Sequence, residues 1–90
     1  MVLNDSPIVA LNRAVAVAML EGPPAGLAQI DTVATHPALH DYYLLPATRG
    51  ELKRRLGNYA AAASEYRHAL SLTEAEPVRR FIEKRLASLE

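Results

Sequence analysis

The chain has 90 residues, of which half are hydrophobic, and its ten basic and ten acidic side chains give a formal net charge of zero. This length allows one domain with a modest core, and the hydrophobic content excludes disorder by composition. The absence of cysteine excludes disulfide frameworks and thiolate metal sites. Because no apolar stretch is long enough to cross a bilayer and no signal pattern opens the chain, we expect no membrane contact and a cytoplasmic location.

The first half of the chain predicts two helices joined by a tight turn. Strong helix formers dominate and β-branched residues never alternate, which favours an all-α fold. Ser6 and Pro7 are typical of a helix start, since serine caps exposed amides and proline suits the first helical position. Gly22 and Pro23-Pro24 predict the end of this helix and the start of a second one, which should stop before Pro37.

Three more helices follow from similar signals. We expect a third helix from about Asp41 to Leu56, with Pro46 in its first turns, a fourth from about Tyr59 to Leu72, and a fifth from about Glu76. Helical spacing assigns to the inward faces Ile8, Leu11, Val15, Ala18, Met19, Leu27, Ile30, Val33, Ala34, Leu45, Leu52, Leu56, Tyr59, Ala62, Ala63, Tyr66, Ala69, Leu70, Val78, Phe81, Ile82, Leu86 and Leu89.

The two halves of the chain are related by an internal repeat. A shift of 35 residues brings Gly22 onto Gly57 and Ala28 onto Ala63, close to the period of about 34 residues of tetratricopeptide (TPR) repeats. We therefore predict a single domain, residues 1–90, made of two antiparallel TPR-like hairpins and a capping helix. The hairpins span about residues 6–36 and 41–72, and the cap about residues 76–89.

The second hairpin carries the stronger TPR pattern of small and aromatic residues, at Gly50, Gly57, Tyr59, Ala62, Tyr66 and Ala69. Small residues let two helix backbones approach, and aromatic rings fill the space between repeat units. Pro46 stands where TPR units usually have tryptophan, and Glu74 where they usually end in proline.

Over nearly its whole length the chain resembles the C-terminal extension of one group of bacterial sigma factors. The stretches that carry the resemblance are SPIVALNRAVAV, LLPATRGELKRRLG and PVRRFIEKRL, and Pro46 and Gly50 fit this family better than a generic TPR unit. The group consists of extracytoplasmic-function (ECF) sigma factors with a TPR-like tail. The resemblance implies that the chain is part of a longer sigma factor whose promoter-reading and polymerase-binding domains precede it.

From this resemblance we expect a non-catalytic domain that modulates transcription initiation through protein contacts. The expected partners are the sigma-factor core domains, RNA polymerase or a regulatory protein. The alternatives are an independent TPR-type peptide-binding adaptor and a small-molecule sensor, and incomplete cover of the repeat face favours self-association as a homodimer.

The candidate interaction surface combines polar residues of the first helix with residues around the third helix. It comprises Asn12, Arg13, Tyr42, Tyr43, Arg49 and Lys53, which we place along the concave side formed by the first helix of each hairpin. The basic run Lys53-Arg54-Arg55 spreads around its helix and lacks interleaved aromatic residues, so we do not expect direct DNA binding.

The sequence contains no pattern typical of catalysis or of cofactor binding. His36 and His40 have a spacing that suits a metal on one helix face, but Pro37 lies between them and no third ligand is evident. We therefore expect no catalytic, cofactor or metal site. Glu51, Glu65 and Glu83 are interpreted as helix-surface charges, some with basic partners three or four residues further along.

Overall fold

The computed structural model describes residues 7–89, and within this range it contains α-helices, one short 3-10 helix and no strand. The helices are α1 (Pro7–Glu21), α2 (Pro23–Val33), η1 (Pro37–Leu39), α3 (Leu44–Arg55), α4 (Tyr59–Ser71) and α5 (Glu76–Ser88). The predicted all-α fold of two hairpins and a final helix is confirmed. In the described range, no helix combines the length and the apolarity needed to cross a membrane.

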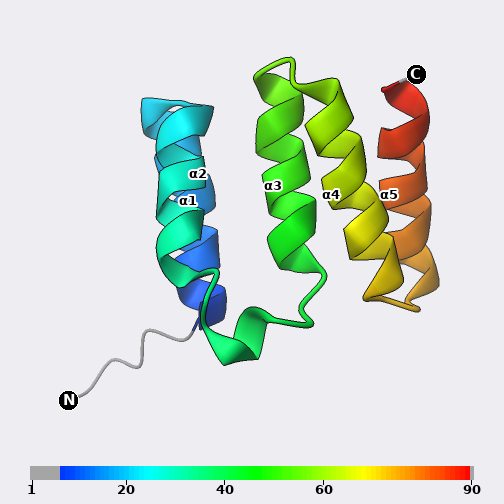
Figure 1. The fold of residues 1–90 in the computed structure, drawn as a ribbon, viewed down its shortest axis with the longest axis horizontal. Helices are drawn as coiled ribbons and strands as arrows, with labels where there is room; N and C mark the ends of the chain where they lie inside the picture. The colour runs from blue at the N-terminus through cyan, green and yellow to red at the C-terminus, as the bar shows by residue number, and fades with distance from the viewer. Residues whose placement is uncertain (1–6, 90) are drawn as a thin grey trace.

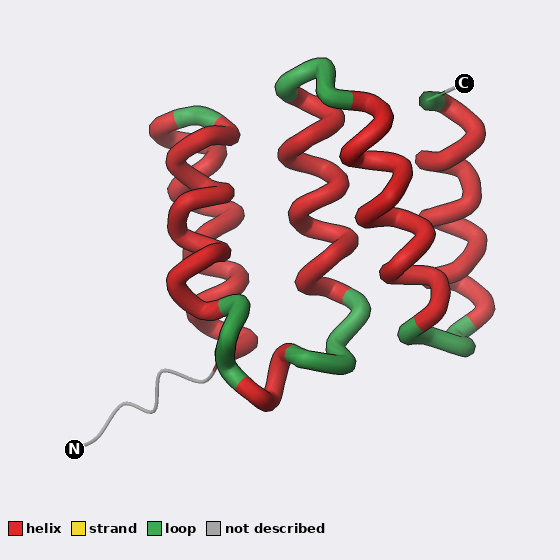
Figure 2. Tube along the Cα trace, in the orientation of Figure 1, coloured by secondary structure: helices red, strands yellow, loops and turns green. Residues whose placement is uncertain are grey.

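The helices form two antiparallel hairpins followed by a single helix. In Figure 1, α1 and α2 lie together at one end of the molecule, and α3, α4 and α5 follow toward the other end. Figure 2 shows that short loops make the hairpin turns and that the longest connection runs from α2 to α3. The two hairpin turns share one device, because Gly22 has φ 103° and Gly57 has φ 82°. Positive φ strains other residues, so the repeated glycines are explained by the backbone they allow.

The connection between the hairpins is anchored in the core rather than extended over the surface. Leu39, in η1, is completely buried. Tight turns continue beyond it, since the amide of Tyr42 donates to the carbonyl of Leu39 at 3.2 Å. For this reason α3 begins at Leu44, three residues later than the predicted start at Asp41.

The buried residues form two clusters, and α3 contributes residues to both of them. The first cluster joins α1, α2 and η1 to α3 through Leu11, Ala14, Ala18, Ile30, Leu39, Leu45 and Leu52. The second joins α4 to α5 through Ala62, Tyr66, Ala69 and Ile82, with Ala47 of α3 packed against it. Tyr42 packs on the first cluster and Tyr43 on the second, and their rings meet edge to face with centroids 5.5 Å apart. Helix α3 is thus the shared wall of the fold.

Some of the predicted inward residues are exposed. Met19 is 72% exposed, Leu56 48%, Tyr59 54% and Phe81 51%. Met19, Leu56 and Tyr59 lie near the hairpin turns, where no neighbouring helix extends to cover them, and Phe81 lies beside the packed face of α5 rather than on it. The side chains of Ile8 and Val33, and the predicted cap Ser6, lie outside the described part of the chain.

Candidate functional site

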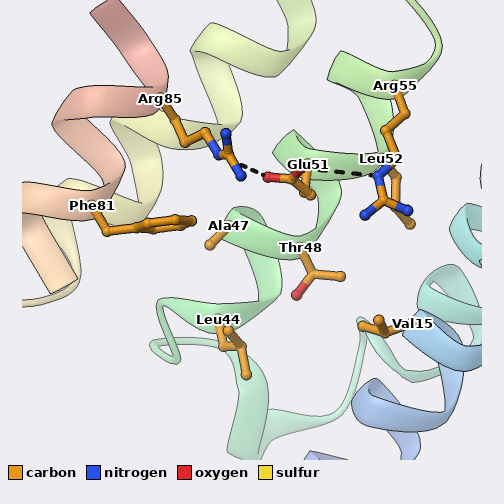
Figure 3. A pocket seen from close by; sticks show the side chains of 9 residues that line it. All are labelled: Val15, Leu44, Ala47, Thr48, Glu51, Leu52, Arg55, Phe81 and Arg85. Atoms are coloured by element: carbon orange, nitrogen blue, oxygen red, sulfur yellow. Dashed lines mark ion pairs between the residues drawn. The ribbon is translucent and has the colours of Figure 1, made fainter. Parts of the chain in front are cut away.

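The first helices of the two hairpins and α5 together form an open groove of about 290 Å³. Figure 3 shows its lining side chains, which come from α3 in the centre, α5 on one side and α1 on the other. They are Val15, Leu44, Ala47, Thr48, Glu51, Leu52, Arg55, Phe81 and Arg85. The groove lies along the first helices of the hairpins, where the sequence predicted a concave surface, but its lining residues differ from the predicted ones.

The geometry of α3 explains why this helix dominates the groove. Its lining residues recur every three or four positions from Leu44 to Arg55, which places them on one helical face. Leu45 lies on another face, in the cluster of the first hairpin, and Gly50 lies against the ring of Tyr66 in α4. The face of α3 between these two packed faces forms the centre of the groove.

Glu51 is the centre of the polar interactions in the groove. Its carboxylate accepts hydrogen bonds from Arg54, one turn along α3, and from the Tyr66 hydroxyl at 3.0 Å. Two further cations lie close to it: Arg85 Nε is 3.3 Å from Oε1 and Arg55 Nε is 3.9 Å from Oε2. The prediction of a surface charge with partners three and four residues on is thus incomplete, because Glu51 also joins α3 to α4 and α5.

These contacts hold Glu51 ionised. Partial burial opposes ionisation, but the hydrogen bonds from Arg54 and Tyr66 and the charges of Arg54 and Arg85 outweigh it and lower the pKa of Glu51. Burial and the neighbouring carboxylate raise the pKa of Tyr66, so its phenol stays protonated and remains a donor. The pKa of Arg54 is raised, chiefly by its hydrogen bond to Glu51.

An apolar cavity of about 300 Å³ adjoins the groove between α3 and α5. It shares Leu44, Ala47 and Phe81 with the groove and is completed by Tyr43, Pro77, Val78 and Ile82. The Phe81 ring lines both the apolar cavity and the groove, and the Arg85 guanidinium lies 5.1 Å from its centroid, within the range of a cation–π contact. One continuous surface therefore offers apolar contact at one end and cations at the other.

The Glu51 carboxylate is a fixed anion of the groove at neutral pH, because hydrogen bonds and neighbouring cations lower its pKa below the ordinary value. The groove is also open, whereas pockets for small ligands bury most of the ligand surface.

The six residues predicted as an interaction surface lie mostly elsewhere. Asn12 and Arg13 are exposed on α1. Arg49 pairs with Asp31 of α2 at 3.0 Å, and Lys53 pairs with Glu65 of α4 at 2.6 Å, so both hold helices together. Tyr42 packs in the first cluster, and of the six Tyr43 alone lines one of the two cavities described here.

The groove residues were not identified from the sequence, because they form no sequence motif. The residues of α3 that line the groove share one helical face, and this could be inferred from their spacing. Their proximity to Phe81 and Arg85 depends on how α5 packs against α3. His36 and His40 are exposed in the connection before α3. Nowhere in residues 7–89 do three histidine or carboxylate side chains come together in an arrangement that could hold a metal ion.

Comparison with known proteins finds a relative of uncharacterized function. An uncharacterized protein of Rhizobium meliloti (strain 1021) is 39% identical over 70 residues, which cover 78% of this chain and 16% of the relative. The chain thus spans about a sixth of the length of that relative. No protein-family model matches the chain, and no solved structure matches it.

Proposed function

We propose that this chain is a non-catalytic contact module that holds a segment of another protein domain in the groove between α1, α3 and α5. The observation that carries the proposal is the groove itself, an open surface with an apolar floor and a cationic edge. Protein interfaces are enriched in aromatic residues and arginine, and exposed Phe81 with Arg55 and Arg85 gives this groove that character.

We further propose that the module is the regulatory tail of an ECF sigma factor. This step is supported by the resemblance of the stretches around Asn12, Pro46 and Arg80, and by the hairpin fold that such a tail requires. In this function the groove contacts the sigma core domains, RNA polymerase or a regulatory protein, and the contact changes the level of transcription initiation.

The test uses the complete protein encoded by the gene. The sequence ahead of this domain should encode promoter-reading and polymerase-binding domains. Transcription reconstituted with RNA polymerase should then keep its promoter specificity, but change severalfold in level, when residues 7–89 are deleted. Equal transcription by the complete and shortened proteins, or an upstream sequence without sigma domains, would contradict the sigma-factor proposal.

The open groove also favours a second function, that of a peptide-binding adaptor outside transcription. An adaptor would contain further hairpin repeats beyond these residues and would bind an extended peptide without any sigma domain. The same gene sequence distinguishes the two functions, since it contains either sigma domains or more repeats.

A further inference from the structure

The cationic end of the groove carries more positive charge than its one carboxylate neutralises. Three guanidinium groups, from Arg54, Arg55 and Arg85, surround Glu51, which gives this cluster a net charge of +2. Arg54 is committed to Glu51 by its hydrogen bond. Arg55 Nε lies 3.9 Å and Arg85 Nε 3.3 Å from the carboxylate, and the buried Nε of Arg85 has no hydrogen-bond partner, although each guanidinium has five donors.

The arrangement leaves these two arginines suited to a second carboxylate. Their side chains are 45% and 36% exposed, so a ligand can reach them. Each oxygen of Glu51 already accepts one hydrogen bond, from Tyr66 at Oε1 and from Arg54 at Oε2. Arginine donors favour carboxylates because the planar fork of N–H groups matches the two oxygens.

The apolar cavity indicates that the ligand also has an apolar side chain. It begins at Phe81, one helical turn before Arg85, which corresponds to about 6 Å along α5. Its wall contains Val78 and Ile82, and a large aliphatic or aromatic side chain is the group that such a wall binds. A nucleic acid fits poorly, since Phe81 is the one aromatic residue among those that line the groove and a series of rings on which bases could stack is lacking there.

We propose that the groove binds a protein segment in which a bulky apolar side chain and an Asp or Glu carboxylate lie about one helical turn apart. The apolar side chain enters the cavity between α3 and α5, and the carboxylate accepts hydrogen bonds from Arg85 and Arg55. This proposal rests on the contact function proposed above and names the chemistry of the partner.

The experiment titrates the 90-residue protein with short alanine- and glutamine-based helical peptides. The probe carries Leu and, four residues later, Glu; one control has Gln for Glu, a second has Ala for Leu, and an oligothymidylate tests for nucleic acid. Binding is followed by NMR, using the Nε–Hε signals of Arg55 and Arg85 and the methyl signals of Ala47 and Val78. We expect the Leu–Glu peptide to shift the signals of all four residues, with dissociation constants about tenfold higher for both controls.

Protein variants separate a specific site from general charge. Arg85→Gln should weaken the Leu–Glu peptide about tenfold, and Arg85→Lys should weaken it less. Arg80→Gln removes the same charge from an exposed position of α5 and should leave binding unchanged. Circular dichroism establishes that each variant is folded.

Several results would overturn the proposal. They are equal binding of the Glu and Gln peptides, equal weakening by Arg80→Gln and Arg85→Gln, and oligothymidylate binding as tightly as the peptide. If any of these occurs while deletion of residues 7–89 still alters transcription, the inference about the partner fails and the proposed function stands. If the deletion also has no effect, both fail.

Discussion

Glu51 shows how one side chain can serve both stability and the groove. It receives hydrogen bonds from α3 and α4 and lies near a cation of α5, so it ties together the three helices that pack on the second cluster. The same contacts gather cations at the edge of the groove. A residue that a helical-surface interpretation treats as ordinary therefore has a structural role that depends on residues far away in sequence.

Replacement of Glu51 by Gln should destabilise the fold. The substitution keeps the shape of the side chain but leaves Arg54, Arg55 and Arg85 close together without an anion, and we expect a loss of about 1–3 kcal/mol in the free energy of unfolding. Urea denaturation at neutral pH measures this loss. Glu83→Gln, at an exposed position of α5, is the matched control and should change stability little.

The lowered pKa of Glu51 also predicts a dependence on pH. In the unfolded chain its pKa lies near the ordinary value for glutamate, and in the folded protein it is lower. Its contribution to stability is therefore complete above the unfolded pKa and is lost as the pH falls through the folded pKa. Thermal unfolding between neutral pH and pH 3 should show a smaller acid loss for Glu51→Gln than for the wild type. Parallel curves for the two proteins would contradict this assignment.

At the scale of elements, each hairpin has a glycine where its two helices pack closely, but on a different helix of the pair. In the second hairpin the glycine lies on the first helix, and a Cβ at Gly50 would meet Tyr66 ring atoms at 3.0–3.2 Å. In the first hairpin the glycine lies on the second helix, and a Cβ at Gly26 would meet the Ala18 Cβ at 2.5 Å and the Ala14 carbonyl oxygen at 3.1 Å. The sequence repeat thus conserves the hairpin but not the residue that permits close packing.

Alanine substitution of these glycines should be costly to different extents. At Gly50 the overpacking cost of about 1–3 kcal/mol is partly offset by a gain of about 1 kcal/mol in helix propensity, so we expect a net loss of about 1 kcal/mol. At Gly26 the obstacle includes backbone, which cannot rotate away, and we expect a loss of about 2–3 kcal/mol. Chemical denaturation of both variants tests the order; a larger loss at Gly50 than at Gly26 would refute it.

The end of α4 depends on a side chain of α5. Arg79 donates from one guanidinium nitrogen to the carbonyls of Leu70 at 2.7 Å and Thr73 at 2.9 Å. A cation at this position satisfies carbonyls that the helix leaves open and favours the negative end of its dipole. The capping helix is therefore held by these hydrogen bonds as well as by apolar packing.

Removal of these bonds should loosen α5 before the rest of the molecule. We expect Arg79→Met to lower the free energy of unfolding by about 1–2 kcal/mol and to speed amide hydrogen exchange in α5. Arg80→Met, at the exposed neighbouring position, is the control and should leave exchange unchanged. Equal exchange in the two variants would show that Arg79 does not hold the helix.

At the scale of the whole molecule, the two ends of the array have different surfaces. The exposed side of α5 carries the charged residues Arg80, Glu83 and Lys84. The exposed side of α1 carries Val9, Ala16, Met19 and Leu20, with the polar Asn12 and Arg13 between Val9 and Ala16 on the same side. Its largest exposed apolar side chains, Met19 at 72% and Leu20 at 85%, lie together at the end of the helix.

The exposed side chains of Met19 and Leu20 predict concentration-dependent self-association of the 90-residue protein. Sedimentation velocity over a range of concentrations should show a dimer that Leu20→Gln together with Met19→Gln abolishes. The matched control, Glu83→Gln with Lys84→Gln on α5, should dimerise like the wild type. A monomer at every concentration would contradict the prediction.

The all-α class and the order of the helices could be predicted from the amino-acid sequence. Proline and glycine have strong local effects on the backbone, so Pro7, Gly22 and Gly57 could be assigned to helix starts and turns before any packing was known. Helical periodicity likewise identified the most buried residues, such as Leu11 and Tyr66. The resemblance to a sigma-factor tail also comes from the sequence, and it remains a prediction.

The position of the groove and the residues that line it depend on the packing of the helices against one another. Whether a residue at the edge of a helix face is covered depends on the reach of the neighbouring helix, and this is why Met19 and Phe81 proved exposed. The meeting of Glu51 with Tyr66 and Arg85 joins three helices across intervals of 15 and 34 residues, which no local rule predicts. Local conformation follows from neighbours in the chain, whereas a surface of this kind follows from the angles and distances at which whole helices pack.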